Sequence, residues 1–285
     1  MRRTTRIHDR TRRLATLALC VGALEGCVPV SPPSLGALED RLIYQPFDGD
    51  ANWNPAGLAK QDVSFLAADG VKLHGWYCAV ESPRAVVLYA HGNGGNLAHR
   101  APFYRLLTER LGVTVLAFDY RGYGKSEGKP SEEGLLADAR AARRFLAERA
   151  GVPEQEIVLY GQSLGGGVMV DLAAKEGARG LILESTFASL PAVANHKLLL
   201  TGGLLHNHFN SLAKIGDYHG PTLIAHGSAD PLVPIKQAKQ LFAAANEPKW
   251  FITIPDAQHN WTPTLQYVFA LDQFIEQMDA LPNSE

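Results

Sequence analysis

A serine lies in the pattern GQSLG at residues 161–165, in a context that suits a nucleophile. The apolar run Ile157–Tyr160 before it predicts a buried strand, and residues 164–175 after it have the pattern of a helix. A serine at a sharp turn between strand and helix projects its hydroxyl above the sheet, and the glycines of the pattern leave the room that this turn needs. Amides at the start of the helix favour a developing negative charge. We therefore predict that Ser163 is a catalytic nucleophile.

A serine hydroxyl is a poor nucleophile until a neighbouring imidazole takes its proton, so the base must be sought among the 10 histidines. With a turn of this kind, the chain order is serine, acid, histidine. His259 follows the last predicted strand, in a loop at the same edge of the sheet as Ser163, and we predict that it is the base. His226 ends its own strand and is expected to brace a loop, and His91 is expected to be structural.

The third member of such a triad orients the imidazole and stabilises its cation. Asp230 follows the strand predicted at residues 222–225 and precedes His259, which fits the order. Glu184, at the end of an earlier predicted strand, is the alternative. Asp256 is close to His259 in the chain, but it is expected to cap a loop. We favour Asp230 as the acid.

Acyl transfer needs two backbone N–H groups aimed at the oxygen that becomes negative. The amide of Leu164, directly after Ser163, is expected to be one of them. The other is expected from Asn93, because the glycine-rich loop HGNGGN at residues 91–96 leaves the strand predicted at residues 85–90. Loss of one such donor costs about 10²–10³ in rate.

We expect neither a metal nor a cofactor in this site. His206 and His208 form a short HxH pattern that could bind a metal, but an isolated pair of this kind is more often exposed to solvent. The glycines around Ser163 do not fit a dinucleotide-binding pattern.

The elements that must position these residues alternate along the chain after an opening hairpin at residues 63–66 and 71–80. Further strands are expected at residues 85–90, 113–118, 157–160, 181–183, 222–225 and 251–254, and helices at residues 103–111, 131–151, 164–175, 235–245 and 264–278. This order predicts an α/β fold with a mostly parallel sheet and helices on both faces. Residues 185–220 are too long for an ordinary crossover and predict a small helical lid rather than a second domain.

Composition limits the class of protein. The 285 residues are 46% hydrophobic and 20% charged, which suits a globular chain and argues against disorder and a coiled coil. Basic and acidic side chains number 27 and 29, so no general affinity for nucleic acid is indicated. Cys78 lies in an apolar, strand-like stretch and is expected to be a packed thiol without a disulfide partner.

The first residues have the pattern of an export signal. Residues 1–26 contain six arginines and the apolar run Leu14–Leu24, which is too short to cross a bilayer. The pattern LEGC that ends at Cys27 resembles a bacterial lipobox, although its glutamate departs from the small or apolar residue usual there. We therefore expect cleavage before Cys27 and a lipid on that cysteine, which would hold an exported protein on the membrane of a bacterial cell envelope. Cys20 is the weaker candidate, and residues 27–59 are expected to form a tether and N-terminal extension.

Together these motifs resemble the α/β-hydrolase superfamily, and most of all its small-lid, serine-aminopeptidase-like branch, which includes protein depalmitoylases. The matching motifs, in chain order, are HGNGGN, FDYRGYGKSEG, GQSLGG, ESTF, HGSADPLVP and the pair HN that begins at His259. The resemblance covers roughly residues 60–280, and the hydrolase domain is expected at residues 60–282. It implies that Ser163, Asp230 and His259 form the triad.

The resemblance further implies a metal-free serine hydrolase that cleaves small carboxylic esters or thioesters through an acyl-enzyme. A peptidase of the same branch is one alternative, although peptidases of this branch usually carry a larger cap. A membrane-tethered binding protein that uses the fold without turnover is the other alternative, because a fold does not fix a function.

Overall fold

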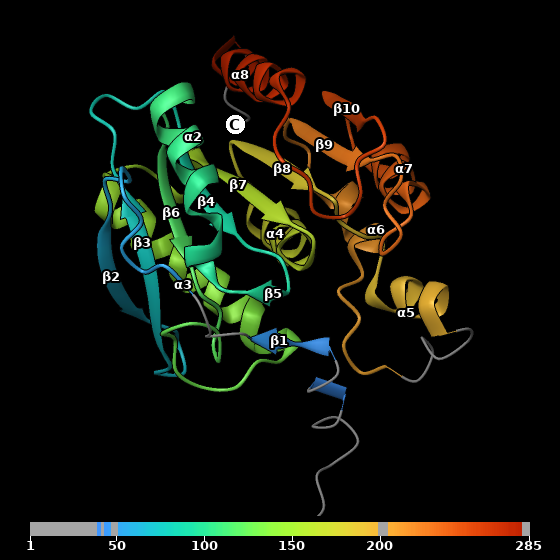
Figure 1. Ribbon diagram of the computed structural model, residues 1–285, viewed down its shortest axis with the longest axis horizontal. Coiled ribbons are helices and arrows are strands. Elements are labelled where there is room, and N and C mark those ends of the chain that lie inside the picture. Colours follow the sequence, from blue (N-terminus) through green and yellow to red (C-terminus); the bar gives the residue numbers. More distant parts are fainter. Residues whose placement is uncertain (1–38, 41–42, 47–50, 199–204, 281–285) are drawn as a thin grey trace, which may run out of the picture. The chain divides into compact units, whose positions relative to one another are not determined.

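Runs rich in valine, leucine and isoleucine form the central sheet of this chain (Figure 1). The structure is a computed structural model that describes residues 39–40, 43–46, 51–198 and 205–280. The strands of the sheet are β2 (Gln61–Leu66), β3 (Lys72–Cys78), β4 (Val86–Ala90), β6 (Thr114–Phe118), β7 (Ile157–Gln162), β8 (Gly180–Glu184), β9 (Thr222–Gly227) and β10 (Lys249–Ile254). They lie in the order β10-β9-β8-β7-β4-β6-β3-β2. The β2–β3 and β3–β6 pairs are antiparallel and the other described pairs of this sheet are parallel, so the predicted hairpin and the mostly parallel sheet are confirmed.

Helices cover both faces of the sheet (Figure 1). They are α2 (Ala101–Leu111), α3 (Glu132–Ala150), α4 (Leu164–Glu176), α7 (Ile235–Ala244) and α8 (Leu265–Ala280). Side chains of α3, α4 and α7 form one hydrophobic core with the strands, and side chains of α2 and α8 form the other. The predicted two-sided α/β architecture is therefore confirmed.

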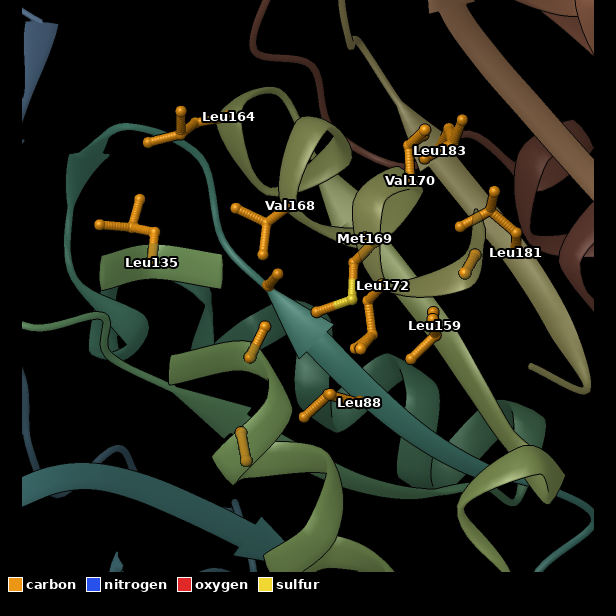
Figure 2. Packing of buried hydrophobic residues seen from close by; sticks show 14 of the residues in the cluster. Leu88, Leu135, Leu159, Leu164, Val168, Met169, Val170, Leu172, Leu181 and Leu183 are labelled. Atoms are coloured by element: carbon orange, nitrogen blue, oxygen red, sulfur yellow. The ribbon is translucent and has the colours of Figure 1, made fainter. Parts of the chain in front are cut away.

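Alternation along the buried strands explains how one strand serves both cores, because successive side chains point to opposite faces. In β4, Leu88 belongs to the core under α3 and α4, whereas Val87 and Tyr89 belong to the core under α2. Figure 2 shows Leu88 together with Leu159 of β7 and Val168 of α4 among the side chains of the first of these cores.

The chain changes direction across the sheet at β4. After β4 it runs first to β6 on one side and then to β7 on the other. Loops that leave two such neighbouring strands at their carboxyl ends diverge and open a crevice, which is where ligands bind in sheets of this kind. Residues 91–96 follow β4 and Ser163 follows β7, so the topology places both at this crevice.

The predicted lid contains α5 (Leu190–Leu198), α6 (Ser211–Lys214) and the short helix η4 (Ile215–Asp217), while residues 199–204 lie outside the described residues. α6 and η4 pack against α4, so this part of the segment belongs to the helical layer on the sheet. α5 protrudes from this layer in Figure 1, although its Leu190 and Val193 pack against the hydrophobic core. That α5 acts as a lid stays a prediction.

The predicted signal and Cys27 lie outside the described residues, whereas part of the predicted tether does not. Gln45–Pro46 form the strand β1, which pairs in parallel with β5 (Gly94–Gly95) in the glycine-rich loop (Figure 1). This part of residues 27–59 is therefore folded onto the hydrolase domain. Cys78 is a buried free thiol, and burial raises its pKa to about 12. Among the described residues, none of the helices is both long enough and apolar enough to span a bilayer.

Candidate active site

Ser163 occupies a strained turn between β7 and α4. Its φ is +51°, in the left-handed region that residues with a side chain rarely adopt. Its N–H donates to the carbonyl oxygen of Glu184 at 2.8 Å. Its own carbonyl oxygen accepts hydrogen bonds from the Gly166 N–H at 2.9 Å and from the Thr186 hydroxyl at 2.8 Å. These hydrogen bonds hold the turn in a conformation that it would otherwise leave.

Two glycines beside Ser163 permit contacts that a larger residue could not make. A Cβ on Gly161 would lie 2.4 Å from the carbonyl oxygen of Gly165, where strand and helix cross. A Cβ on Gly165 would lie 2.1 Å from the carbonyl oxygen of Ala90, at the end of β4. The sequence predicted that both glycines leave room for the turn between strand and helix. At Gly165, however, the close contact is with β4, the strand next to β7.

The structure brings the three predicted triad side chains together at the carboxyl edge of the sheet. His259 Nε2 lies 3.0 Å from Ser163 Oγ, and His259 Nδ1 lies 2.7 Å from Asp230 Oδ2. Because Nδ1 faces a carboxylate, it carries the proton of the neutral ring, and the lone pair of Nε2 points to the hydroxyl. A histidine held in this way can accept a proton from the serine.

Asp230 is held by more groups than His259 alone. Its Oδ1 accepts hydrogen bonds from the N–H groups of Leu232 and Val233, at 2.8 and 2.9 Å. Its Oδ2 lies 3.2 Å from His226 Nε2, in addition to the contact with His259. Burial by itself would raise the pKa of Asp230, but the hydrogen bonds from the two histidines and the Val233 amide outweigh it and hold the pKa well below its ordinary value. The carboxylate is therefore ionised at neutral pH.

His226 has a second contact that the sequence did not indicate. Its Nε2 donates to the carbonyl oxygen of Val233 at 2.8 Å, which fits the expected loop-bracing role. The same nitrogen also faces the triad carboxylate of Asp230. His226 therefore helps to orient Asp230, and its place near the end of β9 was the only sequence signal for this contact.

Glu184, the alternative acid, belongs to a different network beneath the site. Its side chain accepts hydrogen bonds from the Tyr160 hydroxyl and, at 3.0 Å, from the Gln162 amide. Tyr267 approaches it at 3.5 Å. Burial raises the pKa of Glu184 above its ordinary value, against the effect of these hydrogen bonds. In the described part of the chain, the carboxylate hydrogen-bonded to His259 is that of Asp230.

Leu164 directly follows Ser163, and the loop that carries Asn93 passes close to the nucleophile. Leu164 is the first residue of α4, so its N–H has no acceptor within the helix. The glycine-rich loop passes over the nucleophile, because a Cβ on Gly92 would lie 3.4 Å from the Cβ of Ser163. The Asn93 side chain is bound to Ile43, Gln45 and Tyr123, which leaves its backbone as the part that could serve an oxyanion. These two oxyanion roles stay predictions.

The remaining candidate residues lie in structural networks. His91 is buried, with Nδ1 at 2.7 Å from the Gly92 carbonyl oxygen. His206 contacts Glu39, and the N–H of His208 donates to Glu132, so the two histidines do not share a ligand. The N–H of Asp256 donates to Ser228. Among the described residues, no group of three or more histidine, cysteine, aspartate or glutamate residues could hold a metal ion.

A parallel sheet that carries a serine turn, with histidine and aspartate on later loops of the same edge, defines the class of α/β hydrolases. The chain belongs to the α/β-hydrolase superfamily. A family model described as serine aminopeptidase, S33, matches residues 81–214. The protein YfhR of Escherichia coli (strain K12) is 37% identical over 229 residues, covering 76% of this chain and 79% of YfhR.

A plant relative and a solved structure agree with this assignment. The α/β hydrolase domain-containing protein WAV2 of Arabidopsis thaliana is 30% identical over 262 residues, covering 82% of this chain and 85% of WAV2. The fold is similar to that of the Pyrococcus furiosus esterase Pf2001, with a TM-score of 0.69, 23% sequence identity and coverage of 82% of this chain and 98% of that one.

Proposed function

We propose that this protein is a serine hydrolase that cleaves carboxylic esters or thioesters through an acyl-enzyme intermediate. The observation that supports this most is the position of the His259 ring, 3.0 Å from the Ser163 hydroxyl and 2.7 Å from the Asp230 carboxylate. The family membership and the esterase fold neighbours support hydrolysis as the reaction class.

In the first half of the proposed reaction, Ser163 Oγ attacks the carbonyl carbon of the substrate while His259 Nε2 takes the hydroxyl proton. Asp230 stabilises the imidazolium, for which its ionised carboxylate is suited. The negative oxygen of the tetrahedral intermediate accepts hydrogen bonds from the amides of Leu164 and Asn93. When the intermediate collapses, His259 gives its proton to the departing alcohol or thiol, and the acyl group stays on Ser163.

In the second half, a water molecule takes the place of the alcohol or thiol. His259 removes a proton from this water, which attacks the acyl carbon and forms a second tetrahedral intermediate on Ser163. The negative oxygen of this intermediate accepts hydrogen bonds from the same two amides. Collapse then releases the carboxylic acid, and the proton returns from His259 to Ser163 Oγ.

The substrate that we propose is a small acyl ester or thioester. Fold neighbours include the esterase Pf2001 of Pyrococcus furiosus and Est1E of Butyrivibrio proteoclasticus with ferulic acid bound. The family description names a serine aminopeptidase, and a peptidase is therefore the second candidate. Hydrolysis of a p-nitrophenyl ester without release of an amino acid from peptide amides would favour the esterase.

The proposal predicts that Ser163→Ala abolishes labelling by a fluorophosphonate probe, because the probe reacts with an activated serine hydroxyl. Hydrolysis of a short p-nitrophenyl ester should fall by at least about 10³-fold in the same variant. Ser211→Ala is the control, because the Ser211 hydroxyl in α6 is buried and donates to the Phe209 carbonyl oxygen rather than to a histidine, and this variant should keep both signals. Labelling of Ser163→Ala at the unchanged rate would refute the proposal, as would a wild-type protein without any turnover.

We also propose that the protein is exported and held on a membrane by a lipid on Cys27. The basic start of the chain, its short apolar run and the pattern LEGC support this. A single acyl chain binds a membrane reversibly, whereas several chains on one cysteine would give a stable anchor.

A further inference from the structure

The segment between the predicted lipid anchor and the hydrolase domain contacts the glycine-rich loop beside the site. Its strand β1 pairs with β5, with Gln45 opposite Gly94 and Pro46 opposite Gly95. Two-stranded pairs are weak by themselves, and β1 is solvent-exposed. Side-chain contacts on either side of β1 must therefore hold the segment in place.

Asn93 supplies the first of these contacts. Its side-chain amide nitrogen donates to the carbonyl oxygen of Ile43 at 2.5 Å. Its side-chain oxygen accepts hydrogen bonds from the Gln45 N–H at 3.3 Å and from the Tyr123 hydroxyl at 2.7 Å. The orientation of Asn93, whose backbone N–H is the expected oxyanion donor, is therefore fixed from the N-terminal segment and from Tyr123.

Glu39 supplies the second contact, at the other end of the segment. It is buried, and its carboxylate accepts hydrogen bonds from the N–H groups of His206 and Asn207, at 2.8 and 2.7 Å. The Asn207 side chain donates to the same carboxylate at 2.9 Å and accepts a hydrogen bond from the Tyr44 hydroxyl at 2.7 Å. Burial would raise the pKa of Glu39, but the hydrogen bonds from Asn207 and His206 outweigh it and lower the pKa to about 2.

The two contacts join parts of the molecule that are distant in sequence. Asn207 also accepts a hydrogen bond from the Glu132 N–H at the start of α3, at 3.0 Å. Phe209, two residues further on, packs over α4, where a Cβ on Gly167 would lie 3.1 Å from the Phe209 Cβ. Through these contacts, residues 39–40 and 43–46 connect the glycine-rich loop with residues 206–209.

We propose that residues 39–40 and 43–46 form an active-site element, which positions the oxyanion donor of Asn93 at one end and residues 206–207 at the other. This inference rests on the proposed function. Its residues are positioning residues, because they act through Asn93 and Asn207 and do not touch the reacting atoms.

An element that positions the oxyanion donor is expected to affect the rate of the reaction. An oxyanion donor acts only when it points to the place where the negative oxygen forms, and a displacement of about 1 Å costs about 10²-fold in rate. The loop that carries Asn93 continues into Gly94 and Gly95, which restrain the backbone little, and Gly95 has a positive φ of +77°. An outside anchor is therefore needed to fix it, and the described contacts supply one.

The test compares two substitutions at Gln45 in the full-length protein. Gln45→Pro removes the N–H that donates to Asn93, whereas Gln45→Ala keeps it and removes only an exposed side chain. We expect kcat for a p-nitrophenyl ester to fall about 10- to 100-fold in Gln45→Pro, with KM changed less than threefold, and both constants to stay within twofold in Gln45→Ala. A folded Gln45→Pro variant with the kcat of the wild type would overturn the inference.

Tyrosine variants provide a second, independent measurement in case the proline variant does not fold. Tyr44→Phe removes the hydroxyl that donates to Asn207, and Tyr218→Phe is the control, because its buried hydroxyl bonds to the Ala178 carbonyl at the opposite edge of the sheet. We expect KM to rise at least threefold in Tyr44→Phe and to stay constant in Tyr218→Phe. Equal constants in both variants would count against the inference.

Failure of this inference and failure of the proposed function give different results. If the proposed function is wrong, the wild type does not hydrolyse the ester, and the substitution Ser163→Ala does not lower labelling by the fluorophosphonate probe. If only the inference is wrong, the wild type passes both tests while Gln45→Pro and Tyr44→Phe behave like their controls.

Discussion

Two carboxylates lie near the proposed nucleophile, and their surroundings separate their roles. Asp230 is ionised and in contact with the His259 ring, whereas Glu184 is enclosed by Tyr160 and Gln162. Burial tends to raise the pKa of both carboxyl groups. It outweighs the hydrogen bonds only at Glu184, whose pKa is raised above its ordinary value. Asp230 therefore fits the role of a triad acid, because hydrogen bonds from His226 and His259 keep its carboxylate charged.

This difference predicts the outcome of removing each charge. Asp230→Asn should lower kcat/KM by about 10³- to 10⁴-fold, because the amide cannot stabilise the imidazolium and favours the wrong tautomer. Glu184→Gln should stay within about tenfold of the wild type, since Glu184 has no hydrogen bond to His259 among those described. The measurement is steady-state kinetics with one ester. A large loss in Glu184→Gln alone would reverse the assignment of the acid.

Two strands and one helix meet at the nucleophile turn. β7 delivers Ser163, α4 leaves from it, and β4 lies so close that Gly165 nearly touches the Ala90 carbonyl. The Ser163 N–H donates to the Glu184 carbonyl oxygen at the end of β8 and completes the enclosure. The strain at Ser163 therefore depends on packing from both neighbouring strands.

For this reason, Gly165→Ala should prevent the turn from closing. The added Cβ would lie 2.1 Å from one backbone oxygen and 2.9 Å from another, and backbone cannot easily move away. We expect a loss of at least about 2–3 kcal/mol in the free energy of unfolding and no measurable turnover. Chemical denaturation and ester hydrolysis are the measurements. Gly216→Ala is the control, because its Cβ would meet only the Ala244 carbonyl oxygen at 3.5 Å, and it should change neither quantity by much.

On the scale of the whole molecule, the chain upstream of Glu39 would connect the site to the membrane. If Cys27 carries a lipid, residues 28–38 span at most about 40 Å when fully extended. Gln45–Pro46 pair with the glycine-rich loop, so a lipid on Cys27 would tether the carboxyl edge of the sheet to the bilayer. Substrates that reside in or near the membrane would then be within reach of Ser163.

The lipid anchor itself is open to a direct measurement. We expect mass spectrometry of the mature protein from a bacterial membrane fraction to show Cys27 as the first residue, with a mass increase that corresponds to acyl chains. Cys27→Ser should move the protein out of the membrane fraction, whereas Cys20→Ser should not. An unmodified mature terminus at any other residue would show that the signal is of the ordinary secretory kind.

The sequence by itself determined the local features of this protein. A buried strand, a GxSxG turn and a helix follow one another within about 20 residues, and their pattern can be read without knowledge of the rest. The mostly parallel sheet followed as well, because alternating strands and helices have few ways to pack. The predictions for Ser163 and His259 needed only the chain order, and the structure then brought their side chains to hydrogen-bond distance.

Only the tertiary structure decided which distant groups meet. Hydrogen bonds act over about 3 Å, so the choice between two carboxylates depends on how neighbouring strands end, and no local pattern records that. The same holds for His226 against Asp230 and for Gly165 against Ala90. It holds most of all for residues 39–40 and 43–46, which the sequence assigned to a tether and N-terminal extension. Their polar composition fits a tether equally well, and their place on the Asn93 loop is set by partners that lie 48 to 168 residues away in the chain.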